Sequence, residues 1–273
     1  MKKIIIIGGG NMGLAIASGI SSKRLLSKQN ILFIEKNPER IKYLKKKGYF
    51  VSNDLIKTIA KNKSSAEIII LAVKPADFNS LMTLLKKSVS KNILIISILA
   101  GVKIKNIELH FGKNQPIARI MPNTPCQIGE GISALTFNKS ITKKRKDTVR
   151  KIFTSIGKTI EVNENSLDTV TAVSGSGPAY FCYFIESMIN SSRKLGLNQK
   201  LSNELVLQTA KGTLLLLSKN NVAPDELRKS VTSSKGTTEA ALKEFQKKNL
   251  DKIIFSGVKA AKKRSIELGR LNK

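Results

Sequence analysis

The sequence predicts an α/β fold, in which an N-terminal doubly wound parallel sheet is followed by an all-helical C-terminal domain. In the first half of the chain, short runs of branched apolar residues alternate with amphipathic helical stretches. The first run leads directly into a glycine-rich turn, and only helical patterns remain after about Asn163. Unbroken runs of Ile, Leu and Val are typical of strands buried on both faces, so helices should cover both sides of the sheet.

The elements of the first half follow from these runs in order. Strands are expected at Ile4–Ile7, Ile31–Ile34, Ile68–Val73, Ile93–Ile98 and Ile117–Met121. Helical spacing of apolar residues predicts helices at Met12–Ile20, Pro38–Lys47 and Phe78–Val89. A further strand pair is expected at Ile132–Phe137 and Thr159–Val162, on either side of a helix from Thr142 to Ile156. The boundary is placed after residue 162, which gives domains at 1–162 and 163–273.

Long helices are predicted for the rest of the chain. Pro178 suits the first position of a helix, and Gly196 stands where that helix would be capped. The next helix carries many leucines between Leu201 and Leu217, and its second half is apolar on nearly every side. A surface helix needs only one apolar stripe, so burial of this helix against a second subunit is expected.

The composition argues against several classes of protein. The chain has 273 residues, of which 41% are hydrophobic, and no apolar run reaches the roughly 18–20 residues of a membrane span. The apolar run after Lys3 is too short for a secretory signal, so a cytoplasmic chain without a membrane partner is expected. Cys126 and Cys182 lack partners at metal-ligand spacing, and no metal site is expected. The single histidine, His110, lies in a polar connection without an Asp or Ser partner, which argues against Ser-His-Asp hydrolysis.

The formal net charge of +29 suggests a polyanionic partner when it is taken alone. The lysines, however, are spread over the whole chain, and aromatic residues make up only 5% of the sequence. A lysine-rich solvated surface is therefore the preferred interpretation, and no nucleic-acid partner is expected. Such a surface would still speed the arrival of an acidic substrate or a phosphate-bearing cofactor.

The glycine-rich turn has the pattern of a dinucleotide-binding motif. Its sequence is GGGNMG at positions 8–13, between the first strand and the first helix. Gly8 would permit the tight turn, Gly10 would let the backbone approach a pyrophosphate, and Gly13 would let the helix pack closely on the strand. Asn11 and Met12 would present backbone N–H groups from the first turn of the helix. The sequence thus predicts a Rossmann-type domain that binds NAD or NADP.

Residues at the end of the second strand favour two different cofactors. Glu35 closes this strand, 22 residues beyond Gly13, where an acid would bind the ribose 2′-hydroxyl of NAD. Lys36 and Arg40 lie close by and would instead suit the 2′-phosphate of NADP. The preference between NAD and NADP therefore stays open.

Further cofactor contacts are expected where the other strands end. At the carboxyl edge of a doubly wound sheet, backbone at the end of the third major strand lines the nicotinamide side of the crevice. The remaining candidate cofactor-binding residues are Asn53, Ala72, Val73, Lys74, Pro75, Ala100 and Gly101.

Taken together, the motifs resemble those of the pyrroline-5-carboxylate reductase family along nearly the full chain. The matching segments are GGGNMG at 8–13, LAVKP at 71–75, AGV at 100–102, MPNTP at 121–125, VSGSGPAY at 173–180 and TSSKGTTEAAL at 232–242. The resemblance implies a Rossmann domain, an all-helical dimerisation domain and an active site between them. It also implies hydride transfer from NAD(P)H to the cyclic imine of pyrroline-5-carboxylate, which yields proline.

The resemblance assigns the substrate site as well. A threonine of the GTT segment, here Thr238, would place a hydroxyl at the imine nitrogen, while Gly236 and Thr237 would open a helix N-terminus toward the substrate carboxylate. A helix-capping role for Thr237 or Thr238 is compatible with this. Ser176 and Gly177 would form a second helix terminus, and Glu164 matches an acid of the family near the site. Ser233 completes the set. The resemblance further implies a homodimer, or a larger homo-oligomer such as a ring of dimers.

One segment departs from the family pattern. Relatives usually read Ser-Pro-Gly-Gly-Thr-Thr where this chain has Ser233-Ser234-Lys235-Gly236-Thr237-Thr238. The loss of a proline and a glycine alters the stiffness of the loop, and Lys235 adds a cation near the expected substrate.

Two alternative functions share features with this sequence. A β-hydroxyacid dehydrogenase shares the two-domain plan but relies on a lysine in the first long helix of its second domain. The corresponding helix here has no lysine before Lys194. A regulator that binds nucleic acid through its positive charge is the other alternative, and salt-dependent DNA binding would distinguish it from an enzyme.

Overall fold

A computed structural model describes residues 3–86 and 88–271 of the chain. The chain divides into two compact units, one comprising the residues up to Ser176 together with those from Ala261 on, the other Gly177–Ala260. The boundary expected after residue 162 stays a prediction. The contacts within the chain place residues 163–176, and the segment from Ala261 on, in the unit that contains the sheet.

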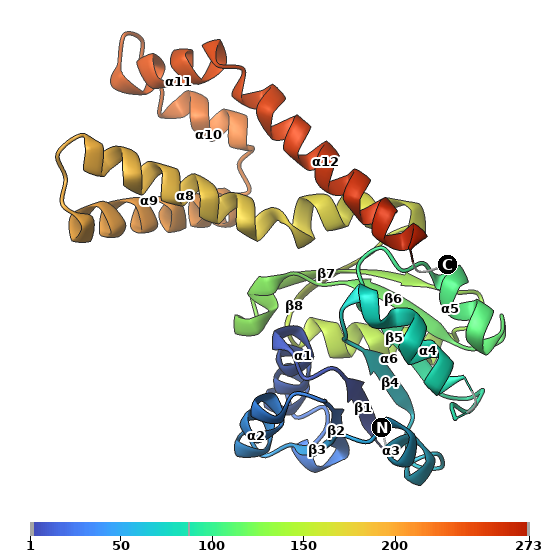
Figure 1. Ribbon diagram of the computed structural model, residues 1–273. Helices are drawn as coiled ribbons and strands as arrows, with labels where there is room; N and C mark the ends of the chain where they lie inside the picture. Colours follow the sequence, from blue (N-terminus) through green and yellow to red (C-terminus); the bar gives the residue numbers. More distant parts are fainter. Residues whose placement is uncertain (1–2, 87, 272–273) are drawn as a thin grey trace. The chain divides into compact units, whose positions relative to one another are not determined.

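The first unit is built on one eight-stranded sheet with the order β3-β2-β1-β4-β5-β6-β7-β8 (Figure 1). The strands are β1 (Ile4–Ile7), β2 (Ile31–Ile34), β3 (Phe50–Ser52), β4 (Ile68–Leu71), β5 (Leu94–Ser97), β6 (Ile117–Met121), β7 (Gly131–Phe137) and β8 (Gly157–Glu161). All neighbouring pairs are parallel except β6 and β7, which are antiparallel. The expectation of a parallel sheet thus holds for its first six strands, and the chain reverses at β7.

Helices cover both faces of the sheet, as a doubly wound fold requires. The helices of this part are α1 (Asn11–Ser22), α2 (Pro38–Lys46), α3 (Leu55–Lys61), α4 (Phe78–Leu85), α5 (Ile104–Phe111), α6 (Lys143–Thr154) and α7 (Leu167–Val170). Alternate residues of β1 enter two separate cores. Ile4 and Ile6 pack with α1, α2 and α6, whereas Ile5 and Ile7 pack with α3, α4 and α5.

Some predicted boundaries needed correction. β4 and β5 are shorter than expected at their carboxyl ends, because Val73 and Ile98 already lie in the loops that leave the sheet. Both β3 and α3 were missed, since a three-residue strand and a short helix show little periodicity. His110 was expected in a polar connection but lies in α5, where its ring packs edge-on against Phe78 with centroids 5.8 Å apart. Burial, and then the nearby charge of Lys86, lower the pKa of His110.

The remaining helices include α8 (Gly177–Lys194), α9 (Gln199–Asn220), α10 (Pro224–Ser230), α11 (Thr237–Lys247) and α12 (Leu250–Arg270). Gly196 adopts a φ of +102° just after α8, in agreement with its predicted capping role. Pro178, in contrast, is not the first helical residue. A π-helical turn at Thr171–Gly175 precedes α8, and the helix begins at Gly177.

The second unit has almost no apolar core of its own. Among the described residues, no buried hydrophobic side chain lies beyond Ala172 in the sequence. On α9, Leu205 is 49% exposed, Leu214 56% and Leu216 49%. This agrees with the prediction that α9 has an apolar surplus, which an isolated chain leaves in contact with water.

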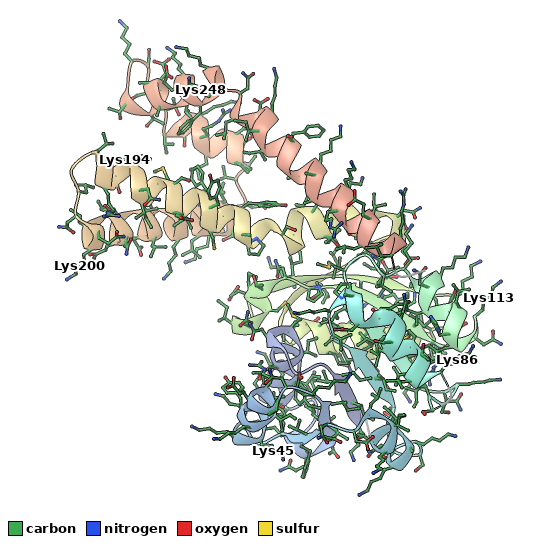
Figure 2. All side chains as sticks on the ribbon, viewed as in Figure 1. Lys45, Lys86, Lys113, Lys194, Lys200 and Lys248 are labelled. Carbon is green, nitrogen blue, oxygen red and sulfur yellow. The ribbon has the colours of Figure 1, made fainter. Side chains whose placement is uncertain are left out.

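The lysines lie at the surface, as the composition suggested. Figure 2 shows side chains that extend away from the ribbon at Lys45, Lys86, Lys113, Lys194, Lys200 and Lys248, and all six are exposed. No helix among the described residues is long and apolar enough to cross a membrane.

Candidate active site

The candidate cofactor residues follow the carboxyl ends of five neighbouring strands. Gly8 comes after β1, Glu35 after β2, Asn53 after β3, Ala72 after β4, and Ala100 lies in the loop after β5. These strands are mutually parallel, so their carboxyl ends meet along one edge of the sheet. The connections from β1 and β4 lead in opposite directions along the sheet, and a crevice for ligands forms outside such a switch point.

The glycine-rich turn is closely packed at two positions and open at a third. Gly8 has a φ of +102°, and a Cβ there would lie 2.4 Å from the carbonyl oxygen of Ala72. A Cβ on Gly13 would lie 2.4 Å from the carbonyl oxygen of Gly8, so close packing of α1 on β1 requires glycine. At Gly10, the N-cap of α1, a Cβ would meet nothing within 4 Å. The exposed backbone at Gly10 and the N-terminus of α1, which includes Asn11 and Met12, therefore suit a phosphate group.

The carboxylate of Glu35 is fixed by backbone groups of the same region. Its Oε2 accepts a hydrogen bond from the backbone N–H of Gly9 at 2.7 Å. Its Oε1 accepts from the N–H groups of Lys36 and Asn37 at 2.7 and 2.9 Å. A negative charge is thus held beside the glycine-rich turn, where an adenosine ribose would lie in a Rossmann fold.

A cation contacts the same turn. The Nε of Arg40 donates to the backbone oxygen of Gly9, and its guanidinium carbon lies 4.9 Å from the centroid of the Tyr43 ring. Its Nη2 is buried without a hydrogen-bond partner in the described parts of the chain. Lys36, by contrast, is exposed. The site therefore offers both an acid for a ribose hydroxyl and a cation for a phosphate.

The loop after β4 completes this edge. The N–H of Ala72 donates to the oxygen of Ile7 at 2.8 Å, which continues the pairing of β4 with β1 by one residue. Val73 is half-buried and Lys74 exposed, and Lys74 precedes a short 3₁₀ turn at Pro75–Asp77. The backbone of 72–75 thus leaves the sheet directly beside Gly8.

In the second unit, the GTT segment forms the start of α11. Gly236 is the N-cap, and no side chain caps the helix, so the first-turn N–H groups are open to a ligand. Thr237 and Thr238 are the first two helical residues. The suggestion that one of these threonines caps the helix was therefore wrong, because Gly236 occupies the capping position.

The loop before α11 is a tight turn. The N–H of Gly236 donates to the oxygen of Ser233 at 3.1 Å, and Lys235 lies between them with a φ of +61°. The N–H of Lys235 donates to Oε2 of Glu239 at 2.9 Å. This hydrogen bond, followed by the interaction with Lys243, lowers the pKa of Glu239. The departure from the family pattern therefore places a lysine in a backbone conformation that favours glycine.

The segment around Ser176 differs from the expected open helix terminus. The N–H of Ser176 donates to the oxygen of Thr171 at 2.9 Å, because the π-helical turn runs into α8. That N–H is consequently not free to receive a substrate carboxylate. Gly177, the first residue of α8, is buried.

Glu164 has partners that the sequence did not predict. Its Oε1 lies 3.1 Å from Nη1 of Arg119 and accepts from the N–H of Ile104 at 2.7 Å. Asp168 lies 3.7 Å from the same guanidinium. The sequence contains one indication of these contacts, which is Arg119 inside the apolar run Ile117–Met121. A charge within a buried strand requires a partner of opposite charge.

Known proteins with similar sequences and structures match almost the whole chain. The model for the pyrroline-5-carboxylate reductase dimerisation domain matches residues 164–268, and a model described as NADP oxidoreductase, coenzyme F420-dependent, matches residues 3–101. The pyrroline-5-carboxylate reductase of Pseudomonas aeruginosa is 33% identical over 97% of this chain and 96% of its own length. That of Staphylococcus aureus strain COL is 34% identical over 98% of both chains. The chain belongs to the pyrroline-5-carboxylate reductase family.

The solved structures agree with this assignment. The crystal structure of the Plasmodium falciparum pyrroline carboxylate reductase with NADP bound has a TM-score of 0.87, with 32% identity over 98% of each chain. The reductase from Coxiella burnetii has a TM-score of 0.85 and 31% identity, and the comparison covers 98% of each chain. Both the family and the fold inferred from the motifs are confirmed. Because residues 164–268 match a dimerisation domain, the reductase is a homo-oligomer.

Proposed function

We infer that Thr238 is the catalytic residue of this NAD(P)H-dependent pyrroline-5-carboxylate reductase, which reduces L-1-pyrroline-5-carboxylate to L-proline, the last step of proline biosynthesis. Reduction of a cyclic imine requires a hydride at carbon and a proton at nitrogen, and it needs neither a metal nor a covalent nucleophile. A hydroxyl donor at the imine nitrogen stabilises the transition state in which the charge on nitrogen changes. The observation that carries the inference is the open N-terminus of α11, where Thr238 is the second helical residue after the N-cap Gly236 and no side chain caps the helix.

The cofactor would be held along the carboxyl edge of the sheet. Gly8, Gly10, Asn11, Met12 and Gly13 would surround the pyrophosphate, and the space at Gly10 fits this role. When bound, the nicotinamide supplies the hydride. The adenosine ribose would lie against Glu35 and Lys36, with Asn53 beyond them. The nicotinamide end would contact the loops that contain Ala72, Val73, Lys74, Pro75, Ala100 and Gly101.

The imino acid substrate would bind through its carboxylate to the N–H groups of Thr237 and Thr238, beside Gly236, whose own N–H is already bonded to the oxygen of Ser233. These groups carry partial positive charge at the helix N-terminus and have no acceptor within the helix. The turn that begins at Ser233 would position them. Ser176 and Gly177 would contribute through their side chain and backbone, although the N–H of Ser176 is already bonded. Glu164 completes the proposed substrate residues.

The assembly is proposed to be a two-fold dimer in which α8 and α9 of the two subunits cover one another, with rings of such dimers as a larger form. The exposed aromatic residues of α8, with Phe181 at 63% and Tyr183 at 72%, support this proposal, as do the leucines of α9. The enzyme is proposed to act in the cytoplasm. The evolutionary domains are proposed to meet between residues 162 and 163, which agrees with the start of the matched dimerisation region at 164.

Steady-state oxidation of NADH and of NADPH, each with pyrroline-5-carboxylate supplied, tests the function. We expect imine-dependent oxidation of at least one cofactor, with proline as the product. The variant Gly10→Val serves as the control that should bind neither cofactor. If the wild-type chain bound cofactor and pyrroline-5-carboxylate without forming proline, the proposal would be wrong.

A further inference from the structure

A buried arginine ties four segments of the first unit together. Arg119 lies in β6, between β5 and β7, and its side chain is only 3% exposed. A guanidinium buried to this extent requires carboxylate partners, because the loss of hydration must be offset by ion pairing and hydrogen bonds. These partners are Glu164 at 3.1 Å and Asp168 at 3.7 Å, both from the segment that follows β8.

Each carboxylate also has a second partner elsewhere in the chain. Oε1 of Glu164 accepts from the N–H of Ile104, the first residue of α5, at 2.7 Å. This helix has no side-chain cap at Lys103, so Glu164 satisfies an N–H group that would otherwise lack an acceptor. Oδ1 of Asp168 accepts from the hydroxyl of Ser265 in α12 at 2.8 Å, in a buried bond across 97 residues of sequence. We call Arg119, Glu164, Asp168 and Ser265 the Arg119 cluster.

Two members of the cluster, Glu164 and Ser265, lie next to the loop that follows β5. The loop after β5 includes Ala100 and Gly101 and ends where Glu164 holds Ile104. Gly101 has a φ of +79°, and a Cβ on it would lie 2.6 Å from the backbone oxygen of Ser265. The contact is reciprocal, since a Cβ on Gly269 would lie 2.3 Å from the backbone oxygen of Gly101. The loop therefore rests on α12 at Gly101 and is bound to Glu164 at its end.

We propose that the Arg119 cluster positions the Ala100–Gly101 loop for the cofactor, and that Oε1 of Glu164 has this role in addition to the substrate contact proposed above for the residue. This rests on the proposed function, which assigns the loop to the nicotinamide end of the cofactor. Oε1 of Glu164 has two donors, Arg119 and Ile104, so this oxygen is bound within the protein. Asp168, Arg119 and Ser265 are thus positioning residues, and Glu164 combines this role with its proposed substrate contact.

The proposed effect on the reaction is geometric. Hydride transfer depends steeply on the placement of the nicotinamide, and a misplacement of about 1 Å can cost on the order of 100-fold in rate. Ser265→Ala removes one hydrogen bond from the side of α12, while the ion pairs of Arg119 remain. Glu164→Gln keeps an oxygen acceptor but removes the charge. Although these changes lie at opposite ends of the loop, both should displace it.

The test measures three quantities for Ser265→Ala, Glu164→Gln and the double variant: the Kd of NAD(P)H from cofactor fluorescence, the kinetic constants, and Tm. We expect each single variant to weaken cofactor binding and lower kcat by about 3- to 30-fold, and Ser265→Ala to leave the KM for pyrroline-5-carboxylate unchanged. The double variant should be less than additive, because both changes release the same loop. Ser140→Ala is the matched control, because it removes a serine hydrogen bond to the oxygen of Lys113 elsewhere in this unit. It should lower Tm slightly and leave the Kd of NAD(P)H and the kinetic constants unchanged.

Two results would overturn the proposal. If Glu164→Gln raised only the KM for pyrroline-5-carboxylate and Ser265→Ala left the Kd of NAD(P)H and kcat at wild-type values, Glu164 would serve the substrate alone and the cluster would not position the loop. If both variants lowered Tm while the Kd of NAD(P)H and kcat stayed at wild-type values, the cluster would only stabilise the fold. The fluorescence titration requires no turnover, so a failure of the proposed reaction is distinguishable from a failure of this inference.

Discussion

The backbone N–H of Gly9 donates a 2.7 Å hydrogen bond to the carboxylate of Glu35, which joins the glycine-rich turn to the end of β2 across 26 residues of sequence. Together with the N–H groups of Lys36 and Asn37, this bond fixes both carboxylate oxygens. The acid that would face an adenosine ribose therefore also shapes the turn that would hold the pyrophosphate. Cofactor affinity and cofactor choice are consequently linked through one side chain.

Glu35→Gln tests this link. Gln can accept only at its amide oxygen, so at least one backbone donor loses its partner, and we expect a loss of about 1–3 kcal/mol in the free energy of unfolding. NADH should bind more weakly, whereas NADPH should be affected less, because the removed charge would repel a 2′-phosphate. Fluorescence titration with both cofactors, alongside thermal unfolding, measures these effects. An unchanged ratio of the two affinities would show that Glu35 serves the turn alone.

Gly10→Val should abolish cofactor binding while the fold survives. The Cβ of the new side chain meets no protein atom, but it would occupy the space in which the backbone approaches the pyrophosphate. Gly13→Val is the contrasting variant and should lower Tm strongly, because its Cβ would lie 2.4 Å from the oxygen of Gly8. Near-normal cofactor affinity in Gly10→Val would remove the phosphate site from this turn.

Thr238→Ala should lower kcat/KM by on the order of 10- to 1000-fold, which corresponds to one lost transition-state hydrogen bond in a desolvated site. Cofactor affinity should remain, because Thr238 lies on α11 rather than on the sheet. Thr238→Ser retains the hydroxyl and should recover most of the activity, and Thr237→Ala is the neighbouring control. Steady-state kinetics with NAD(P)H and pyrroline-5-carboxylate decides the matter. Wild-type activity in Thr238→Ala would exclude a catalytic role.

Lys235→Gly should raise Tm. A lysine in the left-handed region costs about 1–2 kcal/mol, whereas the added chain entropy of glycine in the unfolded state costs about 0.4–1 kcal/mol, so relief of the strain should prevail. Ser234→Gly lies next to it without a positive φ and should only destabilise the chain. Thermal unfolding of both variants provides the comparison. A Tm for Lys235→Gly at or below that of the wild type would show that the turn tolerates lysine without strain.

Leu215→Glu and Leu216→Glu should yield insoluble or inactive chains. Both leucines are nearly half exposed in the isolated subunit, and burial in a dimer would stabilise each by up to about 1.5–3 kcal/mol. A charge on this apolar surface would oppose association, whereas Lys219→Glu on the same helix tests the effect of charge alone. Light scattering on purified protein gives the mass of the assembly. A stable, active wild-type monomer near 30.0 kDa would contradict an obligate dimer.

Much of this protein could be read from local sequence. The runs at Ile4–Ile7, Ile31–Ile34 and Ile117–Met121 gave strands with the predicted bounds, because unbroken branched apolar residues favour buried parallel strands. The glycine motif between β1 and α1, the helical second half and the apolar surplus of α9 also follow from the sequence alone. Each of these features depends on residues that are close together in the chain.

The tertiary structure alone decided the features that depend on distant partners. Arg119 meets Glu164 45 residues later, and Asp168 meets Ser265 97 residues later, distances at which no spacing rule relates two positions. Two further features depend on which elements meet in the fold. One is the antiparallel placement of β7, and the other is the packing of the segment that starts at Ala261 against the unit that contains the sheet. Residue type and periodicity set local conformation, whereas the pairing of buried charges is settled only when the whole chain has packed.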